Sequence, residues 1–369
     1  MSERRIRVGI VGLNAERGWA AAAHVPALRT LSAEYEIVGV ANSSHQSALA
    51  AAKRFDVPQA FESVAAMVQS ADIDLVVVTV KVPQHLALVT AALEAGKHVY
   101  CEWPLGNGLE EARTLARLAQ ARGVMAVVGT QARMAPEIIH LRTLVRDGYV
   151  GEVLSTTLTA TGAGWGGIVA SADAYTLDIT TGATLLTIPL GHTLAALTEA
   201  LGPFTELSAV TATRRTTALV ADTGQTVPMT AEDQVVVAGL LEGGAPVAVH
   251  YRGAPAHGPG LVWEVNGTKG DLRITGPGGH SQLMQLALFG ATSNDEPWQA
   301  LTLPPELAAD AHDGPVAGNV RRIYAALAHD LRHGTKTAPT FDDAVETHRL
   351  IAAIERAAAT GERTRPDAF

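Results

Sequence analysis

The stretch RRIRVGIVGLNAERGWAAAAHVPALRTL, residues 4–31, decides the fold of this chain. The apolar, β-branched run from Ile6 to Val11 is typical of a buried parallel strand, and Gly12 ends it where a turn must begin. A helix-forming segment follows the turn. Strand, glycine turn and helix in this order predict the first unit of a dinucleotide-binding fold, in which backbone N–H groups face a pyrophosphate.

The glycine spacing in this turn departs from the usual three-glycine fingerprint. Counted from Gly12, the second position is held by Asn14, and the next glycine, Gly18, falls one residue late. We therefore expect a longer phosphate loop, from Gly12 to Ala20, with Trp19 at its exit. Gly12, Asn14, Gly18 and Trp19 are the cofactor-binding residues predicted here, and the alternative is an ordinary strand-to-helix turn.

Length and composition exclude several classes of protein. The 369 residues are enough for two domains and a large core, and no apolar run approaches the roughly 18 residues of a membrane helix. The N-terminus lacks the apolar core of a signal peptide, and Cys101, the one cysteine, cannot form an intramolecular disulfide, so we expect a cytoplasmic protein. A net charge of −9 without a basic stripe argues against direct nucleic-acid binding.

Alternating strands and helices fill roughly the first 130 residues. Strands are expected at 35–41, 75–80, 99–102 and 125–129, and helices at 47–55, 64–69, 85–95 and 110–122. This alternation predicts an α/β domain with a doubly wound parallel sheet, the Rossmann arrangement, over residues 1–128.

From Gly151 the pattern changes to strands of alternating polarity and hairpins. Strands are expected at 153–160, 206–213, 234–241, 247–252, 261–265 and 271–275, with helices near 185–201, 320–332 and 342–360. We predict an α+β domain over residues 129–369, built on an open antiparallel sheet and serving substrate binding and oligomerisation.

The turn after the second strand bears on the choice of cofactor. An acidic residue there would bind the ribose hydroxyls of NAD, but the chain has Asn42, Ser43 and Ser44. A turn without a carboxylate leaves room for the 2′-phosphate of NADP, although no arginine stands beside it. The prediction is NAD or NADP with a preference for NADP, and Ser43 is a predicted contact.

At Glu102-Trp103-Pro104 the chain resembles the glucose-fructose oxidoreductase/inositol dehydrogenase/MocA (Gfo/Idh/MocA) dehydrogenases, which carry Glu-Lys-Pro here. The match continues in the runs 24–28, 83–85 and 182–192. Within the family, residues 12–20, 146–151, 164–165, 191–193 and 267–272 are similar to the branch of the fungal repressor of the galactose regulon, a member without known dehydrogenase activity.

This resemblance implies several site residues. Glu102, Trp103 and Gln131 are expected near the cofactor, with a cis bond between Trp103 and Pro104. The family's catalytic histidine corresponds to His192, whereas its aspartate four residues earlier is replaced by Ile188.

Trp103 also replaces the catalytic lysine, so two of three catalytic positions are lost. An indole offers one neutral donor and a flat face, and cannot shuttle protons. His192 must then act alone as acid or base, or with Tyr175 or Asp178 from the preceding loop. Trp165 is either a lid on the substrate site or a wedge in the sheet domain.

Two functions follow from these observations. The first is an NAD(P)-dependent oxidoreductase acting on a sugar, polyol or sugar derivative, with His192 catalytic and Trp165, Tyr175 and Asp178 at the substrate. The second is a non-catalytic dinucleotide sensor that acts through a protein partner. The family resemblance also implies a homodimer or homotetramer. No metal site is predicted, since the His329/His333 pair lacks a zincin glutamate.

Overall fold

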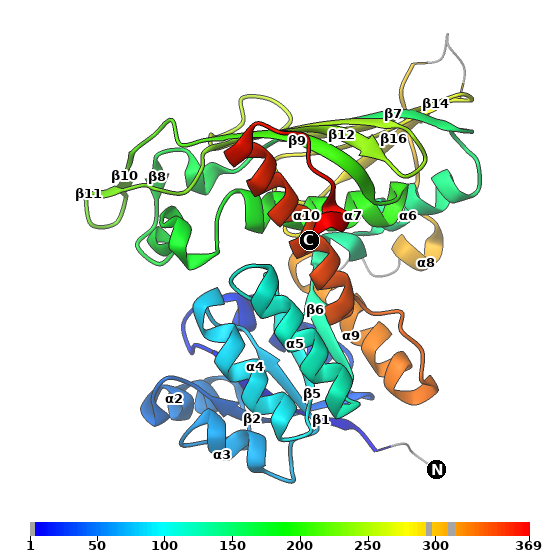
Figure 1. Ribbon diagram of the computed structural model, residues 1–369. Coiled ribbons are helices and arrows are strands. Elements are labelled where there is room, and N and C mark those ends of the chain that lie inside the picture. Colours follow the sequence, from blue (N-terminus) through cyan, green and yellow to red (C-terminus); the bar gives the residue numbers. More distant parts are fainter. Residues whose placement is uncertain (1–3, 293–296, 309–313) are drawn as a thin grey trace. The chain divides into compact units, whose positions relative to one another are not determined.

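The computed structural model describes residues 4–292, 297–308 and 314–369, which form two compact units (Figure 1). The first unit is the described part of Met1–Gln131 together with that of His312–Val345. The second is the described part of Ala132–Ala311 together with Glu346–Phe369. The chain therefore returns to the first unit near its end. The predicted division at residue 128 places this returning segment in the second domain instead.

A six-stranded sheet in the order β3-β2-β1-β4-β5-β6 forms the centre of the first unit, and its pairs are parallel. The strands are β1 (Ile6–Val11), β2 (Tyr35–Ala41), β3 (Gln59–Ala60), β4 (Leu75–Val78), β5 (His98–Glu102) and β6 (Ala126–Gly129). Strands β4 and β6 are buried along their whole length, as continuous apolar runs require. This confirms the predicted Rossmann sheet.

Helices cover this sheet. They are the π-helical turn η1 (Ala20–His24), α1 (Val25–Thr30), α2 (His45–Phe55), α3 (Val64–Gln69), α4 (His85–Glu94), α5 (Leu109–Arg122) and α9 (Gly314–His333), with short 3₁₀ turns at Val82–Gln84 and Gln131–Met134. Helix α4 contacts both α3 and α5, whereas α9 contacts η1, α1 and β6. Helix α9 thus reaches η1, which follows the glycine turn, although roughly 300 residues separate them in sequence.

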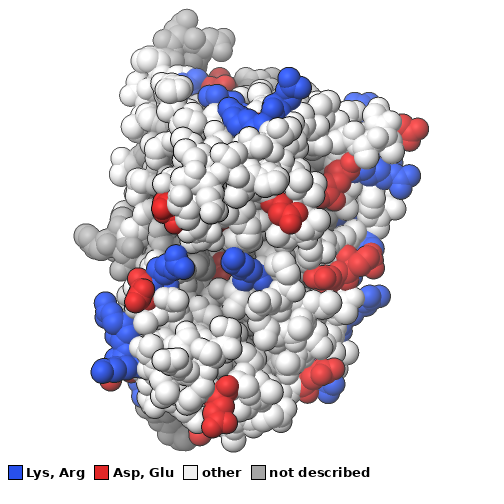
Figure 2. Space-filling model, turned by 90° about the vertical axis from the view of Figure 1, so that its left-hand side faces the viewer, with Lys and Arg blue, Asp and Glu red and all other residues white. Residues whose placement is uncertain are grey.

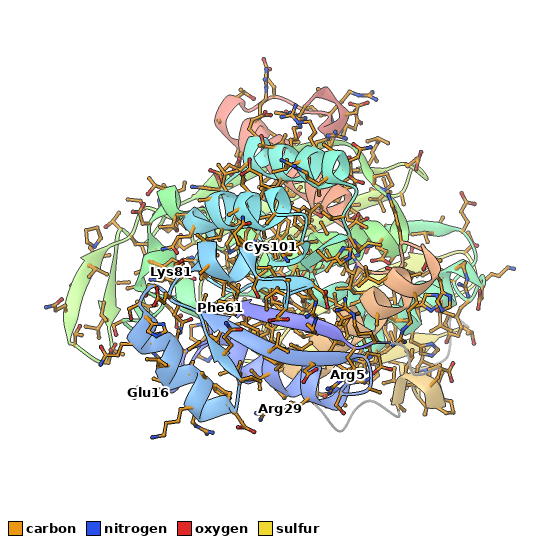
Figure 3. The ribbon with its side chains drawn as sticks, turned by 90° about the horizontal axis from the view of Figure 1, so that it is seen from below. Arg5, Glu16, Arg29, Phe61, Lys81 and Cys101 are labelled. Carbon is orange, nitrogen blue, oxygen red and sulfur yellow. The ribbon has the colours of Figure 1, made fainter. Side chains whose placement is uncertain are left out.

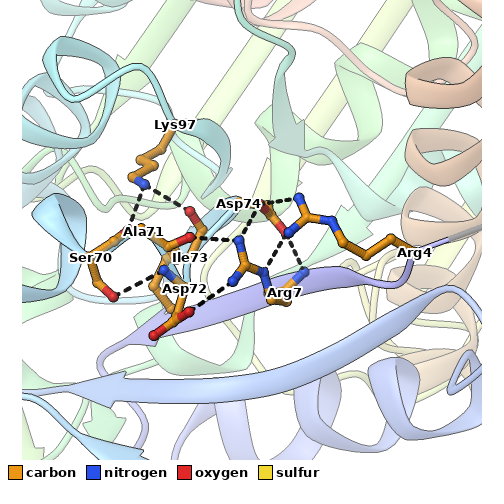
Figure 4. Close-up of polar contacts among 8 residues, drawn as sticks. All are labelled: Arg4, Arg7, Ser70, Ala71, Asp72, Ile73, Asp74 and Lys97. Carbon is orange, nitrogen blue, oxygen red and sulfur yellow. Dashed lines mark hydrogen bonds and ion pairs between the residues drawn. The ribbon is translucent and has the colours of Figure 1, made fainter.

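A polar cluster ties β1 to the start of β4 at the amino ends of the strands (Figure 4). The Arg7 guanidinium donates to both carboxylate oxygens of Asp74, at 3.1 and 3.0 Å, and to Asp72 at 2.9 Å. Arg4 donates to Asp74 as well, and Lys97 caps the carbonyls of Ser70 and Ile73. This cluster lies at the edge opposite the one where Rossmann sheets bind ligands.

An eight-stranded sheet in the order β17-β16-β15-β14-β7-β13-β12-β9 organises the second unit. The strands are β7 (Val153–Thr161), β9 (Phe204–Ala212), β12 (Gln234–Leu241), β13 (Pro246–Arg252), β14 (Leu261–Gly267), β15 (Asp271–Gly276), β16 (Ala287–Ala291) and β17 (Gln299–Ala300). All neighbours are antiparallel except β7 and β13, so the predicted antiparallel sheet is mixed at its centre. A small sheet adds β8 (Ile168–Val169), β10 (Thr217–Val220) and β11 (Gln225–Pro228).

The two faces of the large sheet differ. Burial alternates strictly along β13, and one face carries core side chains such as Trp263 and Tyr251. On the other face Val210, Val236 and His250 lie in one cross-strand row, and the exposed fraction of Val210 is 63%. This second face is an exposed surface of apolar and small residues within the unit.

The helices of the second unit include the one that bears the catalytic candidate. They are α6 (Pro136–Arg146), α7 (Gly191–Leu201), α8 (Pro305–Ala308) and α10 (Phe341–Thr360), which starts within the first unit, with 3₁₀ turns at Ala163–Trp165, Ala174–Leu177, Ile179–Thr181 and Pro366–Ala368. The π-helical turn η7 (Leu186–Leu190), with Pro189 inside it, leads into α7. Helix α6 contacts α7, β15 and β16.

Cys101 lies within β5 in the interior of the first unit, and Arg5 and Arg29 lie at its outside (Figure 3). Burial raises the pKa of the Cys101 thiol well above its ordinary value, so the thiol is inert. On the face shown in Figure 2, basic and acidic side chains are interspersed over a largely uncharged surface. No helix among the described residues is both long and apolar enough to cross a membrane.

Candidate functional site

The turn between β1 and η1 depends on two glycines and an asparagine. Gly12 has φ +97°, and a Cβ there would lie 2.8 Å from Val80 Cγ1 and 3.0 Å from Thr79 Oγ1. Gly18 has φ +104°, again a conformation that favours glycine. The Asn14 side-chain oxygen accepts from the backbone N–H groups of Glu16 and Arg17, at 2.9 and 3.2 Å. Asn14 therefore shapes the loop by a local turn.

Three buried polar atoms follow the carboxyl ends of the parallel strands without a hydrogen-bond partner among the described residues. They are Trp19 Nε1 after β1, Asn42 Oδ1 after β2 and Thr130 Oγ1 after β6. Buried polar atoms are normally satisfied, and open α/β sheets bind ligands at this edge. The unpartnered atoms and the glycine turn therefore fit a dinucleotide.

Asn42 and Ser43 have different environments. The Asn42 amide nitrogen donates to Leu13 O at 2.8 Å and to Ser47 Oγ at 3.0 Å, which fixes the orientation of the amide and leaves Oδ1 as the unpartnered acceptor. Ser43 is exposed, and the adjacent Ser44 caps α2 by accepting from the N–H of Ser47.

Glu102 belongs to a buried network that joins β5, η1 and α9. Its carboxylate pairs with His24 Nε2 at 2.8 Å and accepts from Gln131 Nε2 at 2.9 and 2.8 Å. His24 Nδ1 lies 2.7 Å from the hydroxyl of Tyr324, and Tyr35 donates to the carbonyl of Tyr324. Glu102 and Gln131 thus hold each other at the ends of β5 and β6.

The Trp103–Pro104 bond is cis, which confirms the expectation from the family resemblance. Trp103 is buried, with an exposed fraction of 5%. The His85 ring lies between two carbonyls, with Nδ1 2.8 Å from Pro104 O and Nε2 2.9 Å from Val80 O. Burial lowers the pKa of His85, so its neutral ring donates to one carbonyl at a time. His85 fixes the segment that follows Trp103.

His192 is the second residue of α7 and is buried, with an exposed fraction of 4%. Its Nδ1 has no hydrogen-bond partner among the described residues. Burial, and next the nearby His280, lower the pKa of His192 to about 3. At neutral pH the imidazole is therefore uncharged, and it can donate or accept hydrogen bonds.

The three predicted substrate residues have different surroundings. Trp165 is buried, its ring stacks on His280, and its Nε1 donates to Thr176 O at 3.0 Å. That bond connects it to the 3₁₀ turn that holds Tyr175. Asp178 is exposed, and its Oδ1 accepts from the N–H and hydroxyl of Thr180, which lower its pKa. The Asp178 carboxylate is engaged in its own turn.

Sequence reasoning missed His24, Tyr324 and His280 as members of these clusters. His24 lies in a run that resembles the family, with no role predicted for it, and Tyr324 belongs to a helix that falls within the predicted second domain, 129–369, but lies in the first unit. His280 follows a glycine-rich loop, and nothing in its local pattern marks it. Among the described residues, no group of three or more His, Cys, Asp or Glu side chains is placed to hold a metal ion.

Comparisons with family models match both parts of the chain. Residues 6–130 match the model of the oxidoreductase family with an NAD-binding Rossmann fold, named GFO_IDH_MocA, and residues 136–276 match that of the Gal80p C-terminal domain. The first of these matches spans the parallel sheet and the glycine turn, and the second spans most of the large mixed sheet.

A dehydrogenase and a regulatory protein are each similar to this chain over nearly its whole length. The dehydrogenase aclE of Aspergillus oryzae is 33% identical over 98% of each chain. The galactose/lactose metabolism regulatory protein GAL80 of Saccharomyces cerevisiae is 28% identical over 95% of this chain and 92% of its own length. The crystal structure of a super-repressor mutant of Gal80p superposes with a TM-score of 0.89 at 26% identity, covering 98% of each chain.

Proposed function

We propose a function for this chain, which belongs to the Gfo/Idh/MocA oxidoreductase family. The proposed function is that of an NAD-dependent oxidoreductase that acts on a sugar, polyol or sugar derivative. The observation that carries it is the set of unpartnered buried polar atoms at the strand ends of the first unit. Such atoms are tolerated where a ligand satisfies them.

The residues of the first unit would hold the cofactor as follows. Gly12 and Gly18 permit the backbone to approach the pyrophosphate, and Trp19 Nε1 supplies a donor. Trp103 and the Glu102–Gln131 pair serve the nicotinamide half. When bound, the nicotinamide supplies the hydride acceptor or donor.

Asn42 favours NAD over NADP in this proposal. Because its amide nitrogen is already engaged, Asn42 offers only an acceptor, which suits a ribose hydroxyl. The 2′-phosphate of NADP has no hydrogen to donate once ionised and would face this acceptor unfavourably. We therefore set aside the preference for NADP that the missing carboxylate suggested, and Ser43 is left as a proposed minor contact.

His192 is the proposed acid/base residue of the second unit. Oxidation of an alcohol removes a hydride from carbon and a proton from oxygen, and reduction of a ketone adds both. A neutral imidazole can accept a hydrogen bond from the hydroxyl or donate one to the oxygen on which charge develops. Because burial lowers the pKa of His192 to about 3, the ring is a weak base. In this proposal it therefore holds the reacting oxygen by this hydrogen bond, and the proton is exchanged with water. Trp165, Tyr175 and Asp178 stand as proposed substrate contacts.

A second candidate is a dinucleotide-sensing regulator that acts through a protein partner and performs no chemistry. Trp103 and Ile188 replace the family's lysine and aspartate, so His192 is the one titratable residue left of the three. The similarity to the yeast regulator GAL80 also favours this candidate. The two functions share cofactor binding and differ in turnover.

We also propose that two or four copies assemble. The row of Val210, Val236 and His250 exposes two valines, with exposed fractions of 63% and 41%, and exposed apolar side chains on a sheet face are common at interfaces. Val236→Glu should then lower the molecular mass measured by light scattering. A wild-type protein that already has the mass of one chain would contradict assembly. The proposed compartment is the cytoplasm, where a free thiol such as Cys101 persists.

The oxidoreductase proposal is tested by turnover. The purified protein is mixed with NADH and a panel of uncharged ketoses, or with NAD⁺ and the matching polyols, and the reduced nicotinamide is followed by absorbance. We expect turnover with at least one pair, and its loss in His192→Ala with NADH affinity retained. NADH binding without turnover across the panel would favour the regulator, and turnover retained in His192→Ala would remove His192 from its role.

A further inference from the structure

The loop between β15 and β16 carries a histidine that the function above leaves unused. The His280 ring stacks on the Trp165 indole, with ring centroids 6.0 Å apart and planes inclined by 20°. Gln282 Nε2 donates to His280 Nδ1 at 3.3 Å. A neutral imidazole that accepts at Nδ1 carries its hydrogen on Nε2, so this ring presents an N–H donor.

The residues that follow His280 and His192 are hydrogen-bonded to each other, and this holds the loop of His280 against the start of α7. Thr193, which follows His192, lies with Oγ1 2.8 Å from the Ser281 hydroxyl, which follows His280. The Tyr251 hydroxyl is 2.7 Å from Thr193 Oγ1 and 3.1 Å from Gly279 O. These groups are buried, so the bonds fix the backbone that carries His280 against the start of α7, which carries His192.

Gly279 allows the loop to approach the sheet. Its N–H donates to Thr161 O at 2.8 Å, and a Cβ at this position would lie 2.7 Å from that oxygen and 2.9 Å from the Tyr251 ring. Only glycine fits such a contact without a shift. The placement of His280 is therefore built into the packing of the unit.

The pKa values of both histidines are lowered. His280 contributes to the lowered pKa of His192, and burial lowers the pKa of His280 itself to about 4. Both rings are therefore uncharged at neutral pH. Together they offer the N–H donor of His280 and the buried Nδ1 of His192, which lacks a partner among the described residues.

We propose that His280 is a second substrate-binding residue, and that with His192 it holds a hydroxyl or carbonyl oxygen of an uncharged, polyhydroxylated substrate. The assignment rests on the proposed function, since it adds a residue to the substrate site of the same unit. Two neutral rings suit neutral oxygen atoms, whereas a carboxylate or phosphate group would need a cation to offset its desolvation. The pair thus selects ketoses and polyols over sugar acids.

Histidine ring signals test this pairing directly. The protein, labelled with ¹⁵N-histidine and saturated with NADH, is titrated separately with L-sorbose, D-fructose, D-sorbitol, myo-inositol and D-gluconate. Signals are assigned from His192→Gln and His280→Gln. We expect an uncharged member to shift both rings together, and D-gluconate to shift neither. If no uncharged member moves both rings, the proposal is overturned.

A variant then measures the contribution of the His280 donor. His280→Phe keeps a ring to stack on Trp165 but lacks the N–H, and we expect it to weaken binding of the responding sugar by about tenfold. His280→Gln should restore part of the affinity, and the exposed His257→Phe should leave it unchanged. Wild-type affinity in His280→Phe, with an unchanged melting temperature, would overturn the assignment.

Turnover separates this inference from the proposed function. If both rings respond to a sugar or polyol, but NADH is not oxidised by the ketoses and NAD⁺ is not reduced by the polyols, the oxidoreductase function fails and the binding role of His280 stands. If turnover occurs and the KM of His280→Phe equals that of the wild type, the function stands and this inference fails.

Discussion

At the residue scale, the unpartnered acceptor of Asn42 connects the sequence to the choice of cofactor. Its amide is held by Leu13 O and Ser47 Oγ, so Oδ1 keeps its orientation. The turn contains no carboxylate and no arginine, and in the proposed cofactor site the oriented amide oxygen of Asn42 would discriminate between NAD and NADP.

Asn42→Ala removes this acceptor and should reduce discrimination between the cofactors. We expect NADH affinity to fall by about fivefold to tenfold, as for a neutral hydrogen bond, and NADPH affinity to fall much less. The ratio of the two dissociation constants, from parallel calorimetric titrations, is the readout, because any distortion of the loop affects both cofactors. An unchanged ratio would show that Asn42 does not face the ribose.

Candidate site residues could be predicted where the chain carries a local motif. The glycine turn, the Trp103–Pro104 bond and His192 belong to contiguous runs, and their positions follow from neighbours in sequence. The bond from His24 to Tyr324 spans 300 residues, and the loop of His280 meets α7 through the bond between Ser281 and Thr193, 88 residues apart. Such pairs depend on contacts that no local spacing encodes.

At the element scale, the two ends of β1 have different surroundings. Arg7 joins its amino end to the start of β4 through Asp74, while Gly12 begins the proposed phosphate loop at its carboxyl end. Burial raises the pKa of Asp74, but its hydrogen bonds with Arg7 outweigh burial and leave the pKa below its ordinary value. The pair therefore stabilises the fold above the carboxyl's ordinary pKa, and this contribution is lost as the pH falls through the lowered pKa.

Arg7→Met should weaken the fold without weakening cofactor binding. We expect the free energy of unfolding to drop by about 2 kcal/mol, because the half-buried Asp74 loses its paired donors. Arg113→Met, which breaks an exposed pair with Glu110, is the control and should change it by less than about 0.5 kcal/mol. Urea unfolding and NADH titration give both quantities. A loss of NADH affinity in folded Arg7→Met would contradict the division between the two ends of β1.

The sheets could be predicted better than their connections. Continuous apolar runs mark the parallel strands, and alternation marks the strands of the second unit, because burial on two faces or one imposes these patterns. The return of α9 to the first unit has no such signal, since an amphipathic helix does not specify which apolar surface it covers. The parallel pairing of β7 with β13 is likewise decided by topology.

At the scale of the whole molecule, buried neutral histidines make stability depend on pH. Burial lowers the pKa of His348, in α10, to about 3, whereas in the unfolded chain it is about 6.5. Between these values the unfolded chain binds a proton that the native state does not. Acid therefore destabilises the native state through this residue, and its contribution is fully present only above the higher value.

His348→Asn should remove one proton from the difference in proton binding between the unfolded and native states. We expect its stability to fall less steeply than that of the wild type on acidification, by about 1.4 kcal/mol per pH unit between about pH 6 and pH 4. Urea unfolding at several pH values gives the free energy of unfolding of wild type and variant against pH. Their difference at about pH 7.5, where His348 is neutral in both states, is the baseline. Curves that stay parallel down to about pH 4 would show that His348 titrates alike in both states.

The central claim is that this molecule binds NAD through its first unit, and titration with NADH tests it most directly. Trp19 and Trp103 belong to that unit, so their fluorescence should be quenched as NADH binds. We expect saturable quenching with one NADH per chain, and weaker binding of NADPH. Absence of saturable binding of either cofactor would contradict the claim and would make the turn from Gly12 to Trp19 a structural element only.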